Sequence, residues 1–320
     1  MPRHRSSVLV VGVLLVAMIL SACSSQALSR PSTSGQAAQA PSSPSMTSID
    51  WKPVDQAMGK AGAMQPGNVQ RYSFPRSDLQ VTVHGVPVKP GFALGSHVEF
   101  TPMGTNQAMY MGDLVLTEDE INPVLTKLQQ EGVALMALHN HLLGDTPKVM
   151  YLHIGGSGDP VKAAQAIHDG LAQSKTPLTA PTTSPQPSDV GFDTGQLDQI
   201  LGSKGKANGS IYQFSFPRAE QITDHGMVLP PAIGVATAIN FQATGGGKAA
   251  TTGDFVLLGR EVPGVSQALK QHGIDVTALH SHSLTEEPRL FYLHFWGNDD
   301  PAKLAQGLRA ALDQTNTKKG

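Results

Sequence analysis

Three scarcities narrow what this chain can be. Only one of its 320 residues is a cysteine, Cys23, so neither an intrachain disulfide nor a thiolate metal site is available. The formal net charge is only -2, and no basic segment supplies the positive field that a nucleic acid needs. G-x-S-x-G, P-loop and dinucleotide fingerprints are missing from the sequence as well. We therefore expect no nucleic-acid partner and a fold that its core alone must stabilise.

Long apolar runs are also missing. The longest one, VLVVGVLLVAMIL, starts at Val8 after a short positive segment, and it is shorter than the about 20 residues that a spanning helix needs. It is closed by Leu20-Ser21-Ala22-Cys23, which resembles a bacterial lipobox. We predict a lipoprotein signal peptide at residues 1–22, with acylation, including palmitate, on Cys23. The alternative is an ordinary secretory signal cut at an A-x-A-like site, which would leave Cys23 unmodified.

The segment after Cys23 predicts how the folded part is held. Residues 23–48 are rich in Ser, Ala, Pro and Gln, and such a composition is typical of a flexible tether. Acyl chains on Cys23 would anchor the protein to a membrane without spanning it. We expect an exported, lipid-anchored protein of the cell membrane that faces outward, toward the periplasm or the cell surface.

The sequence of the globular part contains an internal repeat. YSFPRSDLQVTVHG, from Tyr72, matches FSFPRAEQITDHG, from Phe214. ALHNHLLGDTPKVMYLHIGGSGDP, from Ala137, matches ALHSHSLTEEPRLFYLHFWGNDDP, from Ala278. In both matches, the second segment follows the first after nearly the same number of residues. This predicts two tandem homologous units.

Composition sets the boundaries of these units. Residues 175–192 form a Pro/Thr/Ser-rich segment with no periodic pattern, which is typical of a linker. We therefore predict a first repeat unit at residues 49–174 and a second at residues 193–315, followed by a short tail at residues 316–320. Each unit has about the common size of a domain.

Each repeat mixes helical and strand patterns. Opening helices are predicted at residues 54–63 and 195–201, and short strands follow around residues 72–74, 81–84, 98–101 and 113–117. Apolar residues at helical spacing then predict a helix that Gly132 ends. A strand pair and a last helix complete the unit, and this helix begins at Asp159-Pro160 or Asp300-Pro301. The pattern predicts an α+β fold in which each unit has a mixed or antiparallel sheet with helices on one face.

Each repeat places three histidines in the predicted strand pair. His139 and His141 share one face of their strand, because side chains alternate along it. If His141 lies opposite Tyr151, His153 lies across from His139, and three imidazoles can converge on one ion. The same spacing recurs in the second repeat, so the predicted ligands are His139, His141, His153, His280, His282 and His294.

Further ligands are suggested by other matched residues. Asp145 and Glu286 occupy equivalent turn positions and could each supply a carboxylate. His84 and His225 are matched as well, each before a glycine, and could complete a four-ligand site. The alternative for every histidine is a packing role that the duplication preserved.

Several motifs together resemble a known family. The lipobox at Cys23, FPR followed by His-Gly, GDLVL or GDFVL, ALHNH or ALHSH, and YLH before Asp-Pro are similar to the LppY/LpqO family of actinobacterial cell-envelope lipoproteins. The resemblance covers both repeats. It implies a membrane-anchored envelope protein built on a domain of unknown function, and it implies no reaction.

Three functions remain open on the sequence. We expect a binding protein rather than an enzyme, whose repeats each bind a divalent metal such as zinc, or a small polar ligand, on the histidine face. The second hypothesis is a metal-dependent hydrolase of the envelope, with Asp145 or Glu286 as general base. The third is a structural lipoprotein that binds a protein partner, whose identity the sequence does not indicate.

Overall fold

A computed structural model describes residues 49–179 and 188–318, so Cys23, the predicted signal peptide and the predicted tether lie outside the described residues. Residues Met46–Gly320 form one compact unit. Within the described ranges, none of the helices combines the length and the apolar character needed to cross a membrane.

The first repeat alternates strands and helices. Its elements are α1 (Lys52–Ala57), β1 (Ala63–Gln65), β2 (Val69–Pro75), β3 (Val81–Val83), β4 (Val86–Val88), α2 (Pro90–Ala93), β5 (Gly95–Gly104), β6 (Gln107–Thr117), α3 (Glu118–Gln130), β7 (Ala134–His139), β8 (Asp145–Thr146), β9 (Val149–Gly158) and α4 (Pro160–Leu171).

The second repeat has nearly the same elements. They are α5 (Thr194–Leu201), β10 (Lys206–Asn208), β11 (Ile211–Pro217), β12 (Thr223–Asp224), β13 (Met227–Val228), the 3-10 helix η1 (Pro231–Ile233), β14 (Ala236–Gly245), β15 (Lys248–Leu258), α6 (Val262–Gln271), β16 (Asp275–His280), β17 (Leu290–Asp299) and α7 (Pro301–Leu312).

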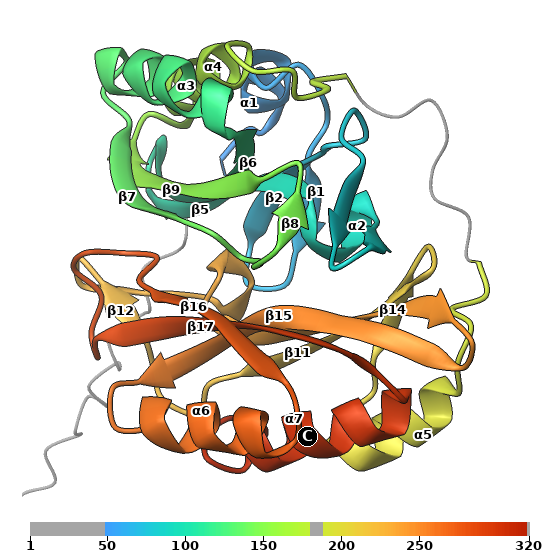
Figure 1. Ribbon diagram of the computed structural model, residues 1–320. Coiled ribbons are helices and arrows are strands. Elements are labelled where there is room, and N and C mark those ends of the chain that lie inside the picture. The colour runs from blue at the N-terminus through green and yellow to red at the C-terminus, as the bar shows by residue number, and fades with distance from the viewer. Residues whose placement is uncertain (1–48, 180–187, 319–320) are drawn as a thin grey trace, which may run out of the picture. The chain divides into compact units, whose positions relative to one another are not determined.

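Each repeat builds one six-stranded antiparallel sheet. The strand orders are β1-β2-β5-β6-β9-β7 and β10-β11-β14-β15-β17-β16, which are equivalent. Three helices cover one face of each sheet, and the two sheets face each other between the two helical layers (Figure 1). The prediction of an α+β fold with two tandem homologous units and helices on one face is confirmed.

The alternation of each strand explains why one face is apolar. Leu152 and Ile154 point toward the helices and join the core that packs α1, α3 and α4 against the first sheet. Leu293 and Phe295 do the same for α5, α6 and α7 in the second repeat. The predicted N-caps also form, since the Asp159 carboxylate accepts hydrogen bonds from the backbone N–H groups of Val161 and Lys162.

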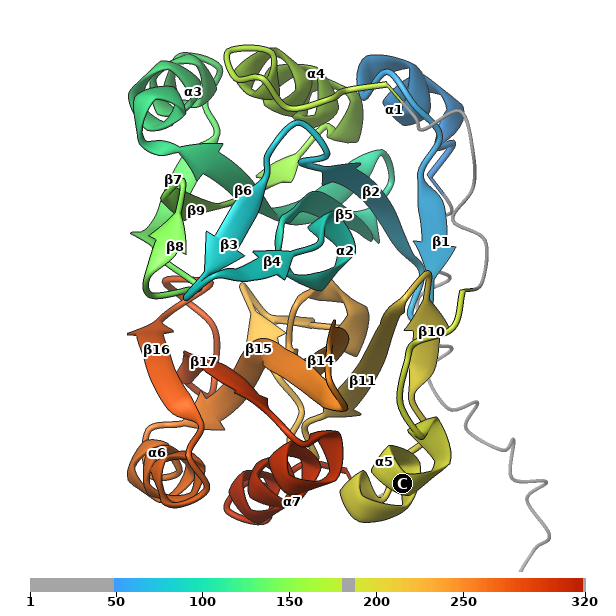
Figure 2. The same cartoon turned by 45° about the vertical axis from the view of Figure 1, so that its right-hand side comes forward.

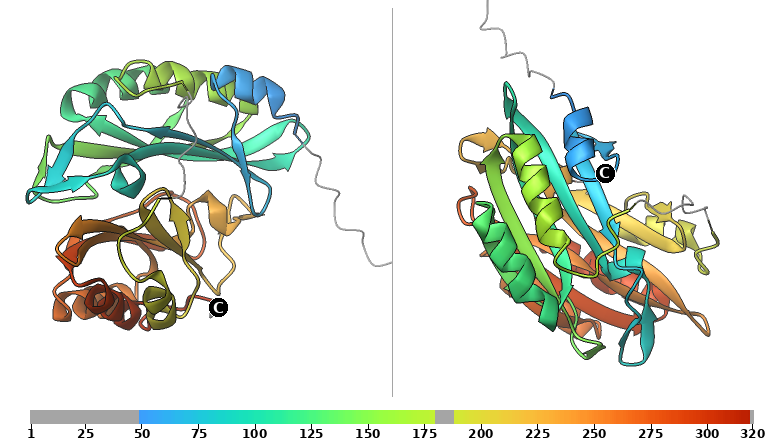
Figure 3. Two further views of the ribbon diagram at one scale, coloured as in Figure 1. Left: turned by 90° about the vertical axis from the view of Figure 1, so that its right-hand side faces the viewer. Right: turned by 90° about the horizontal axis from the view of Figure 1, so that it is seen from above.

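The opposite faces of the two sheets meet through a mixed interface. Phe92 of the first repeat lies edge-on to Trp296 of the second, with ring centroids 6.1 Å apart, inside a core cluster that both repeats share. Gln242 fixes the contact, because its side chain accepts a hydrogen bond from the Lys89 backbone N–H and donates one to the Pro87 carbonyl. Figures 2 and 3 show the two sheets stacked with their helices outward.

Two local predictions differ from the structure. The opening helix is Lys52–Ala57 rather than residues 54–63, because Gly59 adopts a positive φ of 70° directly after the helix. The strand around residues 81–84 does not join the main sheet; β3 pairs with β4 and β8 in a separate three-stranded sheet.

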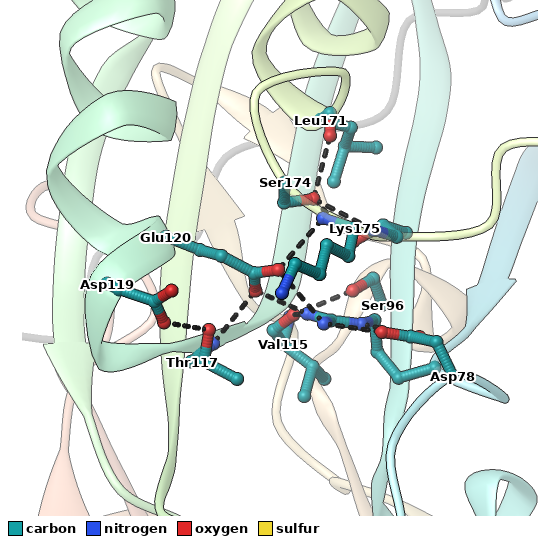
Figure 4. Close-up of polar contacts among 11 residues, drawn as sticks. Asp78, Ser96, Val115, Thr117, Asp119, Glu120, Leu171, Ser174 and Lys175 are labelled. Atoms are coloured by element: carbon teal, nitrogen blue, oxygen red, sulfur yellow. Dashed lines mark hydrogen bonds and ion pairs between the residues drawn. The ribbon is translucent and has the colours of Figure 1, made fainter.

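The arginine of the FPR motif forms a buried ion pair with a glutamate. Arg76, whose side chain is completely buried, donates to both carboxylate oxygens of Glu120, at 2.7 and 3.1 Å, and to the Val115 carbonyl at 2.7 Å. Figure 4 shows Glu120 among its partners, where it also accepts from the backbone N–H groups of Thr117 and Lys175. Arg218 and Glu261 repeat the pair. The motif therefore fastens the start of a helix to the sheet.

Candidate metal centre

The six predicted histidines come from two hairpin-like strand pairs. His139 and His280 end β7 and β16, His153 and His294 lie on β9 and β17, and His141 and His282 follow two residues beyond the ends of β7 and β16. Side chains alternate in direction along a strand, so His139 and His153, like His280 and His294, project from the face that is free of helices, as predicted. The ring centroids of His141 and His282 lie 5.1 and 4.9 Å from those of His139 and His280, which places them beside the others.

The register within the strand pair differs from the prediction by two residues. His139 pairs with Tyr151, and His153 pairs with Ala137, rather than His139 with His153. β7 ends at His139 because the following segment leaves the sheet: Leu142 packs into the core shared by the repeats, and Asp145 pairs with β3. The shift is even, so the face is unchanged, and the rings of His139 and His153 still lie 5.0 Å apart.

The two sets of histidines form one cluster instead of two separate sites. His139 stacks on His280 with ring centroids 3.5 Å apart. The ring centroids of His141 and His294 lie 3.8 Å apart, and those of His153 and His282 lie 3.9 Å apart. Equivalent histidines thus make equivalent contacts, as an approximate two-fold relation between the repeats would produce. We call these six residues, together with the two aspartates described next, the histidine centre.

Asp113 and Asp254 are the carboxylates of the centre, and the sequence interpretation missed them. They lie on β6 and β15, paired in register with His153 and His294. Asp113 lies 3.3 Å from His141 Nε2, and Asp254 lies 3.1 Å from His282 Nε2. The signal was present, because both stand in the repeated GDLVL and GDFVL motifs.

A close approach explains the glycine of the same motif. A Cβ atom on Gly253 would lie 2.0 Å from the Ala238 carbonyl oxygen on the neighbouring strand, a distance that real Cβ atoms do not reach. On Gly112 it would lie 3.0 Å from the His97 carbonyl oxygen. Glycine lets the strands come together directly beside the aspartate, and so helps to place it.

The polar atoms of the centre form groups compact enough for metal ions. Two of these groups share no residue. One consists of Asp113, His141 and His153, and the other of Asp254, His280 and His282; within each group the ligand atoms lie within 4.8 Å of one another. Two further groups connect the repeats through His139. Ligand atoms of a tetrahedral zinc ion lie about 3.4 Å apart, so small side-chain rotations would suffice for coordination.

Most of these atoms are buried without a hydrogen-bond partner. Across the described residues, 13 buried side-chain nitrogen and oxygen atoms have no hydrogen-bond partner, and 11 of them belong to the histidine centre. Two of the 11, His141 Nε2 and His282 Nε2, lie close to Asp113 and Asp254 but form no hydrogen bond with them. Buried polar atoms normally have partners, because an unpaired one costs about 1–3 kcal/mol. So many unpaired polar atoms in one place would carry a large energetic cost unless a ligand paired with them.

Backbone contacts set the orientation of two imidazoles. His294 Nδ1 lies 2.8 Å from the Gly253 carbonyl oxygen, and His139 Nδ1 lies 3.1 Å from the Asn140 carbonyl oxygen. Since a carbonyl only accepts, each Nδ1 carries the hydrogen and each Nε2 presents its lone pair to the centre. Both Nε2 atoms are among those without a partner. This is how metal-binding histidines are commonly held.

Burial keeps the imidazoles neutral. It lowers the pKa of all six histidines below the ordinary value, and like charges among neighbouring imidazoles add to the effect at His141 and His280. Burial also raises the pKa of Asp254, to about 6. Neutral imidazoles have free lone pairs for a metal.

The sequence matches one protein family over both repeats. The family is described as Domain of Unknown Function (DUF1259), and the matches span residues 52–173 and 195–314. The chain belongs to this family. No curated protein matches the chain. The two DUF1259 copies confirm the predicted internal repeat.

Three solved structures show distant similarity to this DUF1259 protein. They are a trimeric bacterial microcompartment shell protein, PduB (16% identity, 81% of this chain and 96% of that chain, TM-score 0.20), EtuB from Clostridium kluyveri (11%, 79% and 88%, 0.18) and the double-ringed trimeric shell protein MSM0271 from the RMM microcompartment (13%, 66% and 85%, 0.17). The TM-scores are too low to support a structural or functional argument.

Four predicted ligands belong to none of the close groups of ligand atoms found among the described residues: His84, Asp145, His225 and Glu286. His84 and His225 are exposed in turns between short strands, where both adopt positive φ. Asp145 accepts a hydrogen bond from the Val149 backbone N–H, and Glu286 accepts from the Leu290 N–H and the Arg289 guanidinium. The two carboxylates cap their own turns, and the role of these four residues as additional ligands stays a prediction.

A cavity of about 1170 Å³ between the repeats reaches the histidine centre. Six members of the centre line it: Asp113, His141, His153, Asp254, His282 and His294. His97 and Glu99 line the same cavity, and the second repeat has Ala238 and Asn240 at the equivalent positions. The two walls of the cavity therefore differ.

Proposed function

We propose that this protein is a lipid-anchored envelope protein whose histidine centre binds divalent transition-metal ions. One observation supports the metal more than any other: 11 buried polar atoms without hydrogen-bond partners converge from both repeats. Imidazole nitrogens together with carboxylate oxygens suit Zn(II), Cu(II), Ni(II) or Fe(II). The two ligand groups without shared residues favour up to two ions, one on the histidines of each repeat.

The metal content of the purified compact unit, residues 46–320, tests this proposal. We expect the wild type to retain about two equivalents of zinc after dialysis, as the two separate ligand groups imply. His141→Ala combined with His282→Ala should lose most of it, because each substitution removes one ligand of one of the two groups. His84→Ala combined with His225→Ala is the matched control, since it removes two histidines outside the centre. Equal metal content in all three proteins would refute the assignment.

The membrane anchor is a separate part of the proposal. It is supported by the lipobox ending in Cys23, by the composition of residues 23–48 and by the resemblance to the LppY/LpqO lipoproteins. In a bacterial host, the wild type should fractionate with membranes and Cys23→Ala should become soluble or remain unprocessed. An unchanged membrane fraction and mass for Cys23→Ala would contradict acylation.

A metal-dependent hydrolase is a second candidate, favoured by the cavity that opens onto the centre. Ions held there would have a side that a small substrate can approach. Asp145 and Glu286 are not suited to the role of general base, because both point into their own turns.

A further inference from the structure

The charge of the cavity differs from that of the chain as a whole. Five cationic side chains line it, although acidic residues outnumber basic ones in the full sequence: Lys60, Arg71, Lys89, Lys204 and Lys206. Three carboxylates line it: Glu99, Asp113 and Asp254. The cations come from both repeats, so the cavity collects positive charge at the place where the repeats meet.

The three carboxylates are engaged with neighbours. Asp113 and Asp254 lie against the imidazoles of the centre. Glu99 is almost fully buried, at 1% exposure, and it contacts Arg71 at 3.1 Å and His97 Nδ1 at 2.9 Å. None of the three is therefore directed at the lysines of the cavity.

The lysines keep their charge available to a ligand. Within the described part of the chain, Lys60, Lys89, Lys204 and Lys206 form no ion pair. Two of them only donate hydrogen bonds to uncharged oxygens: Lys60 to the Ser73 carbonyl and Lys89 to the Ser210 hydroxyl, both at 2.6 Å. Metal ions at the end of the cavity would add further positive charge.

We infer that the metal-loaded cavity binds a small organic oxyanion, a phosphate monoester or a carboxylate, with its anionic group toward the ions. The inference rests on the proposed metal binding and names the ligand class of that site. A volume of about 1170 Å³ is ample for a small molecule. Lysine recognises phosphate and carboxylate as a point charge, and clefts lined by one sign of charge concentrate oppositely charged ligands.

Calorimetric titration of the purified full-length protein, with zinc bound, tests this inference. The probes are phenyl phosphate, benzoate and the neutral benzyl alcohol. We expect one or both anions to bind and benzyl alcohol not to bind; the anion that binds identifies phosphate or carboxylate as the recognised group. Lys204→Glu combined with Lys206→Glu should weaken the binding about fivefold at low salt, because it reverses two charges of the cavity wall. These lysines lie at or next to β10, three strands from β15, so they act through the electrostatic field of the cavity rather than by contact with an anionic group at the ions.

A matched control distinguishes the effect of charges that line the cavity from the effect of the net charge of the protein. Lys52→Glu combined with Lys162→Glu changes the net charge equally at two exposed lysines that do not line the cavity, and it should leave anion binding unchanged. Equal weakening by both double variants, or binding of benzyl alcohol as tight as that of the anions, would overturn the inference. If zinc is retained and neither anion binds, the inference fails alone. If no zinc is retained, the proposed function fails with it.

Discussion

Zinc is expected to stabilise the metal-free compact unit strongly. At free zinc about 1000-fold above the dissociation constant, each site adds about 4 kcal/mol to the free energy of unfolding. The reason is geometric: the ligands come from β6, the β7 and β9 pair, and their counterparts in the second repeat, and only the folded chain brings them together. Chemical denaturation with zinc and with a chelator measures the difference.

Two controls make this result specific. Magnesium prefers oxygen ligands and should produce no comparable shift. The variant with His141→Ala and His282→Ala, which loses one ligand of each group, should respond weakly to zinc. The variant with His84→Ala and His225→Ala should respond like the wild type. A stability that zinc, copper and nickel all leave unchanged would count against a metal centre.

The metal-free protein should lose stability steeply as the pH falls below about 6.5, the ordinary pKa of histidine. Burial lowers the pKa of all six histidines in the folded state, so below that pH the unfolded chain binds more protons than the folded one. The free energy of unfolding therefore rises with pH in this range. The upper limit of the slope is about six protons taken up on unfolding, one for each histidine.

Asp254 opposes this trend to a small extent. Its pKa is raised to about 6, so between its ordinary value and pH 6 the folded state holds one additional proton. One proton does not reverse the effect of six imidazoles. Denaturation curves between pH 8 and pH 5 in a chelator measure the slope. His139→Gln combined with His280→Gln should reduce it, whereas a flat profile in the wild type would contradict buried, neutral histidines.

Sequence patterns predicted those helices and strands well whose formation depends on residues near them in the chain. The helix after Asp159 begins as predicted because an aspartate cap and a proline at the first helical position act within one turn. The helix-free face of β9 follows from simple alternation. The predicted register of the β7 and β9 pair was wrong because the register depends on distant contacts: Leu142 packs into the core cluster that both repeats share, and Asp145 pairs with β3.

The composition of the centre was only partly predictable. Spacing identified its six histidines, but no pattern within one repeat indicates that His139 stacks on His280 of the other. Asp113 and Asp254 were missed because they lie far from the histidines in the chain and meet them only through the pairing of β6 with β9 and of β15 with β17. Their place in the repeated GDLVL and GDFVL motifs marked them only as duplicated residues.

Anomalous scattering at the zinc edge, from crystals of the metal-loaded compact unit, tests the central claim most directly. The account predicts strong peaks inside the histidine centre, within bonding distance of Asp113, His141 and His153 in one repeat and of Asp254, His280 and His282 in the other. Peaks confined to surface residues such as His84 and His225, with none in the centre of a well-ordered crystal, would contradict it.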